Sequence, residues 1–172
     1  MAYRNVEELY RAILNRLAPP GYADTYADES AFEADVWSRL VELLGPDATQ
    51  HCLTSHTQRQ GRSAAAWEAF CRETRGPDVN VLGSNNRLDI VVRNDTASIG
   101  IEVKWLGKGG DHAGKLTQGL GQVMLALENR DRTLLMIHCG GADDIDEGDR
   151  RRLQRVADNI CLGTKTAIIV VP

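Results

Sequence analysis

The chain of 172 residues is long enough to bury one hydrophobic core without disulfides or a structural metal. Hydrophobic residues make up 42% and charged residues 26%, which argues against a disordered chain, a collagen-like repeat and a coiled coil. No stretch approaches the roughly 18 apolar residues of a membrane span, and the N-terminus lacks the apolar run of a signal peptide, so we expect a cytoplasmic protein with no membrane partner. The net charge of −4 excludes a global basic field but is compatible with local basic patches.

Helices are predicted in the N-terminal part of the chain. Apolar residues recur at helical spacing over Val6–Leu17 and again over Glu29–Leu44. Each of these two runs ends at adjacent Pro and Gly residues, which stop a helix. Beyond them, residues 50–55 have the composition of a short strand, and residues 63–71 have that of a third helix.

The pattern changes to strands in the middle of the chain. Residues 87–93 and 99–106 are rich in β-branched residues, and Asn94-Asp95 between them is a turn signal, so an antiparallel hairpin is predicted. The remaining predicted elements are a short apolar segment at 79–82, a helix at 116–127, a strand at 133–138, a polar helix at 146–157 and a strand over Thr166–Val171.

This order of elements predicts a single α/β domain over residues 1–172. Its mixed central β-sheet has four to five strands and is flanked by α-helices on both faces. Residues 1–20 form an accessory N-terminal helix, and residues 29–171 form the core.

Three ionisable residues interrupt strands that are otherwise typical of a core: Asp89, Glu102 and Lys104. If the hairpin turn is centred between residues 95 and 96, Asp89 lies directly opposite Glu102, at about 4.5–5.5 Å between Cβ atoms. Lys104 points to the same face, because it is two residues beyond Glu102. Two carboxylates at that separation repel each other unless a cation lies between them, and oxygen ligands of this kind suit Mg²⁺ or Mn²⁺. The pattern therefore predicts a metal-assisted site that hydrolyses phosphodiesters, with the lysine stabilising charge on the phosphate.

Asp89, followed after twelve residues by Glu102-Val103-Lys104, resembles the PD-(D/E)xK nuclease superfamily. The resemblance covers about residues 29–171. It implies the restriction-endonuclease-like fold and Mg²⁺-dependent cleavage of nucleic acid by an endonuclease or related enzyme. It also implies that Asp89, Glu102 and the carbonyl of Val103 are metal ligands, and that Lys104 is the catalytic lysine. The literal Pro-Asp pair is Pro77-Asp78, so Asp78 remains an alternative to Asp89.

The same resemblance implies further site residues from two helices. A helical glutamate is expected from the first core helix, for which Glu33 is the best match and Glu29, one turn earlier, is the alternative. In the helix after the hairpin, Gln118 and Gln122 lie four residues apart on one face. We expect Gln122 to complete the catalytic site and Gln118 to contact nucleic acid.

Basic residues near the hairpin are candidates for contacts with the phosphate backbone. They are Lys108 and Lys115, in the glycine-rich segment after the second hairpin strand, and Arg87 at the start of the first strand. DNA is the expected partner. By analogy with small nucleases of this kind, a homodimer is expected to cut both strands, and phage defence or DNA processing is the expected setting.

Plainer or different explanations remain for several of these residues. A Glu-x-Lys triplet can be a solvated strand face, although like charges opposite each other destabilise a hairpin. Residues 30–33 match a capping box, in which Glu33 would bind backbone donors. Gly109–Lys115 fits the P-loop pattern of a nucleotide-binding protein, although Leu116 follows it in place of Ser or Thr. A third hypothesis is a catalytically inactive nuclease fold that serves in binding or assembly.

Overall fold

The computed structural model describes residues 3, 5–54, 59, 62–76, 78–81, 84–107, 110–141, 145–161 and 165–172. A mixed sheet of five strands, in the order β1-β4-β5-β6-β7, forms its centre. These strands are β1 (Cys52–Thr54), β4 (Ile90–Arg93), β5 (Ser98–Trp105), β6 (Arg132–His138) and β7 (Thr166–Val171). β1, β4 and β5 are antiparallel neighbours, whereas β5, β6 and β7 run parallel. A separate hairpin pairs β2 (Val79–Val81) with β3 (Ser84–Asn86).

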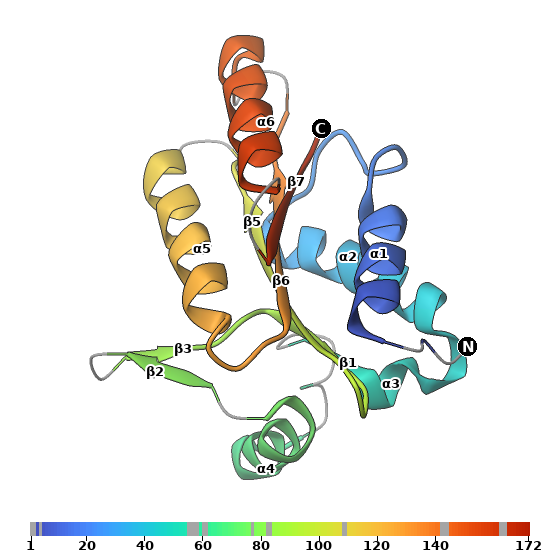
Figure 1. The fold of residues 1–172 in the computed structure, drawn as a ribbon. Helices are drawn as coiled ribbons and strands as arrows, with labels where there is room; N and C mark the ends of the chain where they lie inside the picture. Colours follow the sequence, from blue (N-terminus) through green and yellow to red (C-terminus); the bar gives the residue numbers. More distant parts are fainter. Residues whose placement is uncertain are drawn as a thin grey trace.

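Helices cover both faces of the central sheet (Figure 1). α1 (Val6–Leu17) and α2 (Glu29–Leu44) lie on one face, and a short 3₁₀ turn joins α2 to α3 (Ala48–His51). α5 (His112–Ala126) and α6 (Glu147–Cys161) lie on the other face, because each links two parallel strands and must cross over the sheet. α4 (Ala64–Arg75) lies beyond the end of the sheet, near the β2-β3 hairpin.

The period-two alternation of the strands divides the core into two layers. Ile101 and Val103 of β5 pack with Met136 of β6 in the layer under α1 and α2. Leu135 and Ile137 of β6 belong to the layer under α5 and α6. The mixed α/β architecture with helices on both faces of the sheet is therefore confirmed.

The observed elements differ from the predicted ones mainly at their ends. The bounds of α1, α2 and β7 match the prediction, but β4 begins only at Ile90, after residues 87–89. α5 begins at His112, four residues early, because Asp111 caps it by accepting a hydrogen bond from the amide of Gly114. α2 is capped by Asp28, whose side chain accepts from Ala31, so the capping-box explanation for Glu33 is wrong.

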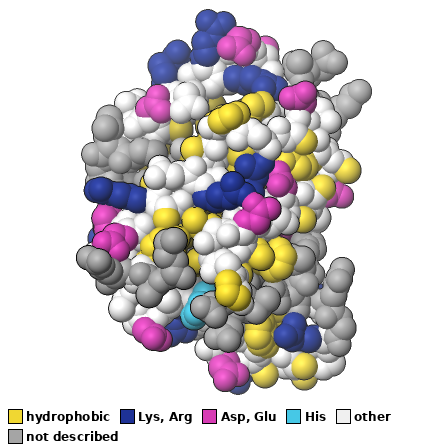
Figure 2. Space-filling model, turned by 90° about the vertical axis from the view of Figure 1, so that its right-hand side faces the viewer, with side chains coloured by type: hydrophobic (Ala, Val, Ile, Leu, Met, Phe, Trp, Pro, Cys, Tyr) yellow, Lys and Arg dark blue, Asp and Glu magenta, His cyan; other side chains and the backbone are white. Residues whose placement is uncertain are grey.

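The face that carries α1 and α2 has charged side chains of both signs, in keeping with the net charge of −4 (Figure 2). Figure 2 shows the side of the molecule on which α1 and α2 lie, where basic and acidic side chains are interspersed and apolar side chains lie between them. None of the helices in the described part of the chain combines the length and the apolar composition needed to cross a bilayer.

Candidate functional site

The hairpin of β4 and β5 has the register that the sequence predicts. Ile90 lies opposite Ile101, and Arg93 lies opposite Ser98, so the turn is centred between residues 95 and 96. Asp89 directly precedes β4, and Glu102 directly follows Ile101 on β5. The paired residues end at Ile90 and Ile101, and Asp89 and Glu102 are the next residue on each side. The charge of Asp89 acts on Glu102, so the two carboxylates lie near each other where β4 begins.

Asp89 is fixed to the main chain of β5. Its Oδ2 accepts a hydrogen bond of 2.8 Å from the amide of Val103. Burial raises the pKa of Asp89, and the nearby charge of Glu29 raises it further, while the Val103 amide and the charge of Lys104 lower it in part. The net increase means that the surroundings of Asp89 do not compensate its negative charge.

Glu102 is buried beside Lys104 on the face that α5 covers. The two side chains are only 1% and 6% exposed, and Lys104 Nζ lies 2.5 Å from Glu102 Oε1. Glu102 Oε2 is buried and, among the described residues, has no hydrogen-bond partner. Burial raises the pKa of Glu102 to about 8, and the charge of Asp89 contributes to the increase although Lys104 opposes it. One lysine therefore does not neutralise the two carboxylates.

Lys104 is held in its charged form. Burial alone would lower its pKa, but Glu102, Asp89 and Glu29 together raise the pKa above its ordinary value. An ammonium group that stays protonated can donate hydrogen bonds and stabilise negative charge, but it cannot act as a base.

The helical glutamate that contacts these groups is Glu29, in the first turn of α2. Its Oε1 lies 3.8 Å from Lys104 Nζ, and its Oε2 accepts a hydrogen bond of 3.2 Å from the amide of Trp105. Glu33, which the sequence favoured, lies one turn further along α2 and is only 3% exposed. The structure thus brings the alternative residue to the end of β5.

α5 packs against the stem of Lys104 at Gly119. A Cβ atom at this position would lie 3.1 Å from Lys104 Cγ and 2.9 Å from Leu135 Cδ1, so the glycine allows the helix to pack closely on the lysine stem. Gly119 is not among the residues predicted for the site, although a glycine inside a helical pattern is the kind of signal that marks close packing.

Gln122 and Gln118 differ in their surroundings. Gln122 is half-buried, one turn after Gly119, and its carbonyl accepts a hydrogen bond of 2.8 Å from Asn86 Nδ2. The side-chain oxygen of Gln122 is buried and has no hydrogen-bond partner in the described part of the chain. Gln118 is exposed, as a residue that contacts a large ligand would be.

The basic candidates lie around this site with partners of their own. Arg87 Nε lies 3.0 Å from Asp78 Oδ2, so Asp78 contacts Arg87 next to the β2-β3 hairpin. Lys115 Nζ donates to the carbonyl of Trp105 at 3.0 Å and lies 5.5 Å from the centre of the Trp105 ring. Lys108 lies outside the described residues.

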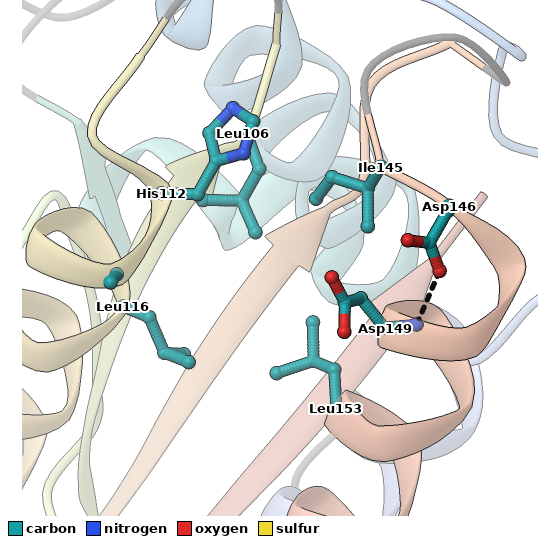
Figure 3. Close-up of a pocket in the computed structure, with 8 residues that line it drawn as sticks. Leu106, His112, Leu116, Ile145, Asp146, Asp149 and Leu153 are labelled. Carbon is teal, nitrogen blue, oxygen red and sulfur yellow. Dashed lines mark hydrogen bonds between the residues drawn. The ribbon is translucent and has the colours of Figure 1, made fainter.

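A pocket of about 350 Å³ opens between the first turns of α5 and α6 (Figure 3). Its lining is largely apolar, but Asp146 and Asp149 contribute carboxylates, and Figure 3 shows the Asp149 side chain directed into the space between the helices. Carboxylates repel phosphate, and Asp111 already occupies the Gly114 amide that a P-loop would offer to a nucleotide. These contacts do not favour a nucleotide at Gly109–Lys115.

The protein ligands available to a metal ion are few. Within the described residues, no group of three or more His, Cys, Asp and Glu side chains has the arrangement of a metal site. Asp89 and Glu102 are two carboxylates, and the Val103 carbonyl points to the same edge of β5 as the Val103 amide, because both groups of a strand residue face the same neighbour. Mg²⁺ is commonly bound by one or two carboxylates together with water and substrate phosphate, so this small donor set fits it.

No protein-family model, curated protein or solved structure matches the chain. The distinctive feature of the described residues is the half-buried Asp89 next to the buried Glu102, with Lys104 in contact with Glu102.

Proposed function

We propose that the chain is a metal-dependent nuclease with the restriction-endonuclease-like fold, which hydrolyses phosphodiester bonds of DNA. The observation that carries the proposal is that Asp89 accepts from the amide of Val103, next to the buried Glu102, whose carboxylate contacts Lys104. Two carboxylates whose pKa values are both raised form a site that is stable in its ionised form only with a cation.

The residues fit a divalent ion with oxygen ligands. Glu102 Oε2 is buried and has no hydrogen-bond partner among the described residues, which suits a metal ligand. Asp89, Glu102 and the Val103 carbonyl would hold Mg²⁺ or Mn²⁺. When bound, the ion would lower the pKa of a water molecule and neutralise charge on the phosphate.

The chain's own groups supply orientation and charge. The Val103 amide fixes the Asp89 carboxylate, which sets the direction in which its second oxygen points. Lys104, charged and next to both carboxylates, would donate to a non-bridging phosphate oxygen or orient the attacking water. Glu29 acts as a positioning residue in this proposal, because it lies 3.8 Å from the Lys104 ammonium and can orient it.

The residues around the site supply the substrate contacts in this proposal. The side-chain oxygen of Gln122 has no hydrogen-bond partner among the described residues, and Gln122 lies one turn after Gly119, which packs on Lys104. The exposed Gln118 would contact the DNA backbone. Lys115 and Arg87 would exchange their present partners for phosphate oxygens, and a homodimer would cut both strands. Cytoplasmic DNA processing or phage defence is the setting that we propose.

The test is a cleavage assay on the purified chain with plasmid, linear duplex, single-stranded DNA and RNA, each in Mg²⁺, Mn²⁺ and EDTA. We expect cleavage of DNA with either metal, none in EDTA, and none by the Glu102→Gln variant. Glu147→Gln is the matched control, because Glu147 is exposed on α6.

Other outcomes assign other functions. DNA binding by the wild-type chain with no cleavage under any of these conditions would identify an inactive binding module. ATP binding that is lost in Lys115→Ala but kept in Lys104→Ala would identify a nucleotide-binding protein.

A further inference from the structure

A cluster of arginine side chains lies beside the main chain that leads into β4. Arg75, the last residue of α4, is only 1% exposed and donates a hydrogen bond to the carbonyl of Leu88. Its Nε and Nη1 are buried and have no hydrogen-bond partner among the described residues. A guanidinium group stays charged in proteins, so Arg75 brings a buried positive charge to the main chain that leads into β4.

Arg130, between α5 and β6, is a second buried arginine with few hydrogen-bond partners among the described residues. It is 8% exposed, and its Nη1 makes only long contacts, of 3.4 Å with Ser98 Oγ and 3.2 Å with the carbonyl of Asn129. Its Nε is buried without a partner in the part of the chain that the structure describes. Burial lowers the pKa of Arg130 to about 10, and the positive charges of Arg75 and Arg93 contribute, which shows that the three groups lie close together.

Gly76 marks the point at which these side chains converge. It has a φ of +75°, which favours glycine, and its missing Cβ would lie 3.4 Å from Arg93 Nη1 and 3.7 Å from Arg130 Nη1. Nη1 of Arg93, at the end of β4, and Nη1 of Arg130, before β6, thus lie beside the same residue, and Arg93 Nη1 also lies 3.5 Å from the carbonyl of Thr74. Arg93 is exposed, so this point is close to the surface.

The cluster has few acidic neighbours among the described residues. The charge of Asp78 acts on Arg75 and Arg130 although its carboxylate also contacts Arg87 at 3.0 Å, and Arg75 acts on Asp89. Buried donors are normally hydrogen-bonded, because an unpaired one is costly to desolvate. An anion with several acceptor oxygens would satisfy the donors that have no partner among the described residues.

We propose that Arg93 and Arg130, which lie beside Gly76 with the charge of Arg75 buried behind them, bind a phosphate group of the nucleic-acid backbone next to the phosphate that is cut. This inference rests on the proposed nuclease function, which it extends by a second contact with the substrate. Guanidinium groups suit phosphate because their paired donors match its oxygens. The cluster is adjacent to the acidic pair, since Arg75 holds Leu88, the residue before Asp89.

The experiment measures the affinity of the full chain for a fluorescein-labelled DNA oligonucleotide by anisotropy in EDTA, where no cleavage occurs. Arg93→Gln and Arg130→Gln are tested alone and together, since Arg93 is exposed and its loss should not disturb folding. Arg151→Gln is the matched control, because Arg151 is exposed on α6 and paired with Glu147. We expect affinity to fall about tenfold in the double variant. The slope of log affinity against log salt should decrease by about one for each lost phosphate contact.

The same variants are tested with inorganic phosphate alone, by its effect on the thermal unfolding midpoint. Phosphate should raise the midpoint of the wild-type chain but not that of the double variant. Unchanged DNA affinity and salt slope in the double variant would overturn the inference. If phosphate protected only the wild type while DNA affinity stayed the same, the site would bind free phosphate, and the nucleic-acid assignment would be wrong. Weaker DNA binding by these variants, with no cleavage by the wild type in Mg²⁺, would support the site and reject the nuclease.

Discussion

The two central strands β5 and β6 lie side by side in the sheet but carry different side chains at matched positions. Glu102 and Lys104 of β5 are in register with Leu135 and Ile137 of β6. All four side chains are buried, so the sheet offers nearly the same environment to both strands. On β6 that environment is filled by apolar groups, as is usual for a parallel strand covered on both faces.

This comparison indicates that the packing of the sheet does not require charged side chains at these positions. A buried ion pair is commonly no more stabilising than apolar side chains of similar volume, and the second oxygen of Glu102 does not even have a partner among the described residues. We therefore attribute the charged residues of β5 to the proposed function, and the apolar residues of β6 to the stability of the fold. Substitutions on β5 and on β6 test this difference between the two strands.

The largest effect is expected on catalysis from Glu102→Gln or Lys104→Met, which keep the volume of the side chain but remove its charge. DNA cleavage should fall by about a thousandfold or more, because a ligand or a charge-stabilising group is lost. Initial cleavage rates in Mg²⁺ measure this, and circular dichroism checks that the variants stay folded. Cleavage at the wild-type rate in either variant would mean that β5 does not supply the chemistry.

On β6, Leu135→Ala should act on stability. Removing a fully buried leucine leaves a cavity and costs about 2–5 kcal/mol of unfolding free energy. Urea denaturation measures the loss. Glu102→Gln in EDTA should instead leave the unfolding free energy unchanged or higher. A large loss in Glu102→Gln, equal to that in Leu135→Ala, would contradict the proposed difference between the strands.

A pH titration of stability should also distinguish the strands. The pKa of Glu102 is raised to about 8 in the folded chain, so between about pH 4.5 and pH 8 the folded state binds more protons than the unfolded state. The unfolding free energy in EDTA should therefore fall as pH rises through this window. Mg²⁺ should restore it most strongly at the upper end, since it binds the ionised carboxylates. Urea unfolding at three pH values measures both trends, and Glu102→Gln should flatten them.

The smallest effect is expected from Gly119→Ala on α5. The added methyl group would press on Lys104 Cγ, so cleavage should fall by up to roughly tenfold. Gly121→Ala is the control, because a Cβ at that position meets nothing within 4 Å. Cleavage rates of the two variants relative to wild type test the difference, and an equal change in both would show that the contact with Lys104 is unimportant.

Sequence periodicity was sufficient for the parts of the fold that depend on local pattern. Helical spacing predicted the bounds of α1 and α2, and the turn at residues 94 and 95 predicted the register of β4 and β5. β3 and α3 were not predicted, because they are short and have little apolar periodicity.

The rest of the site depends on how distant elements pack. Glu29 and Glu33 share a face of α2, and only the placement of that helix across the end of β5 brings Glu29 to Lys104. No local signal connects Arg75, Arg93 and Arg130, since they come from a helix end, a strand end and a loop.

The most direct measurement is the binding of Mn²⁺ to the purified chain at pH 8, followed by electron paramagnetic resonance. Free Mn²⁺ gives a strong signal that weakens on binding, so the ion can be titrated without any nucleic acid. We predict saturable binding to the wild-type chain and loss of that binding in both Asp89→Asn and Glu102→Gln. Wild-type affinity in both variants would show that the two carboxylates of the hairpin do not hold a divalent ion.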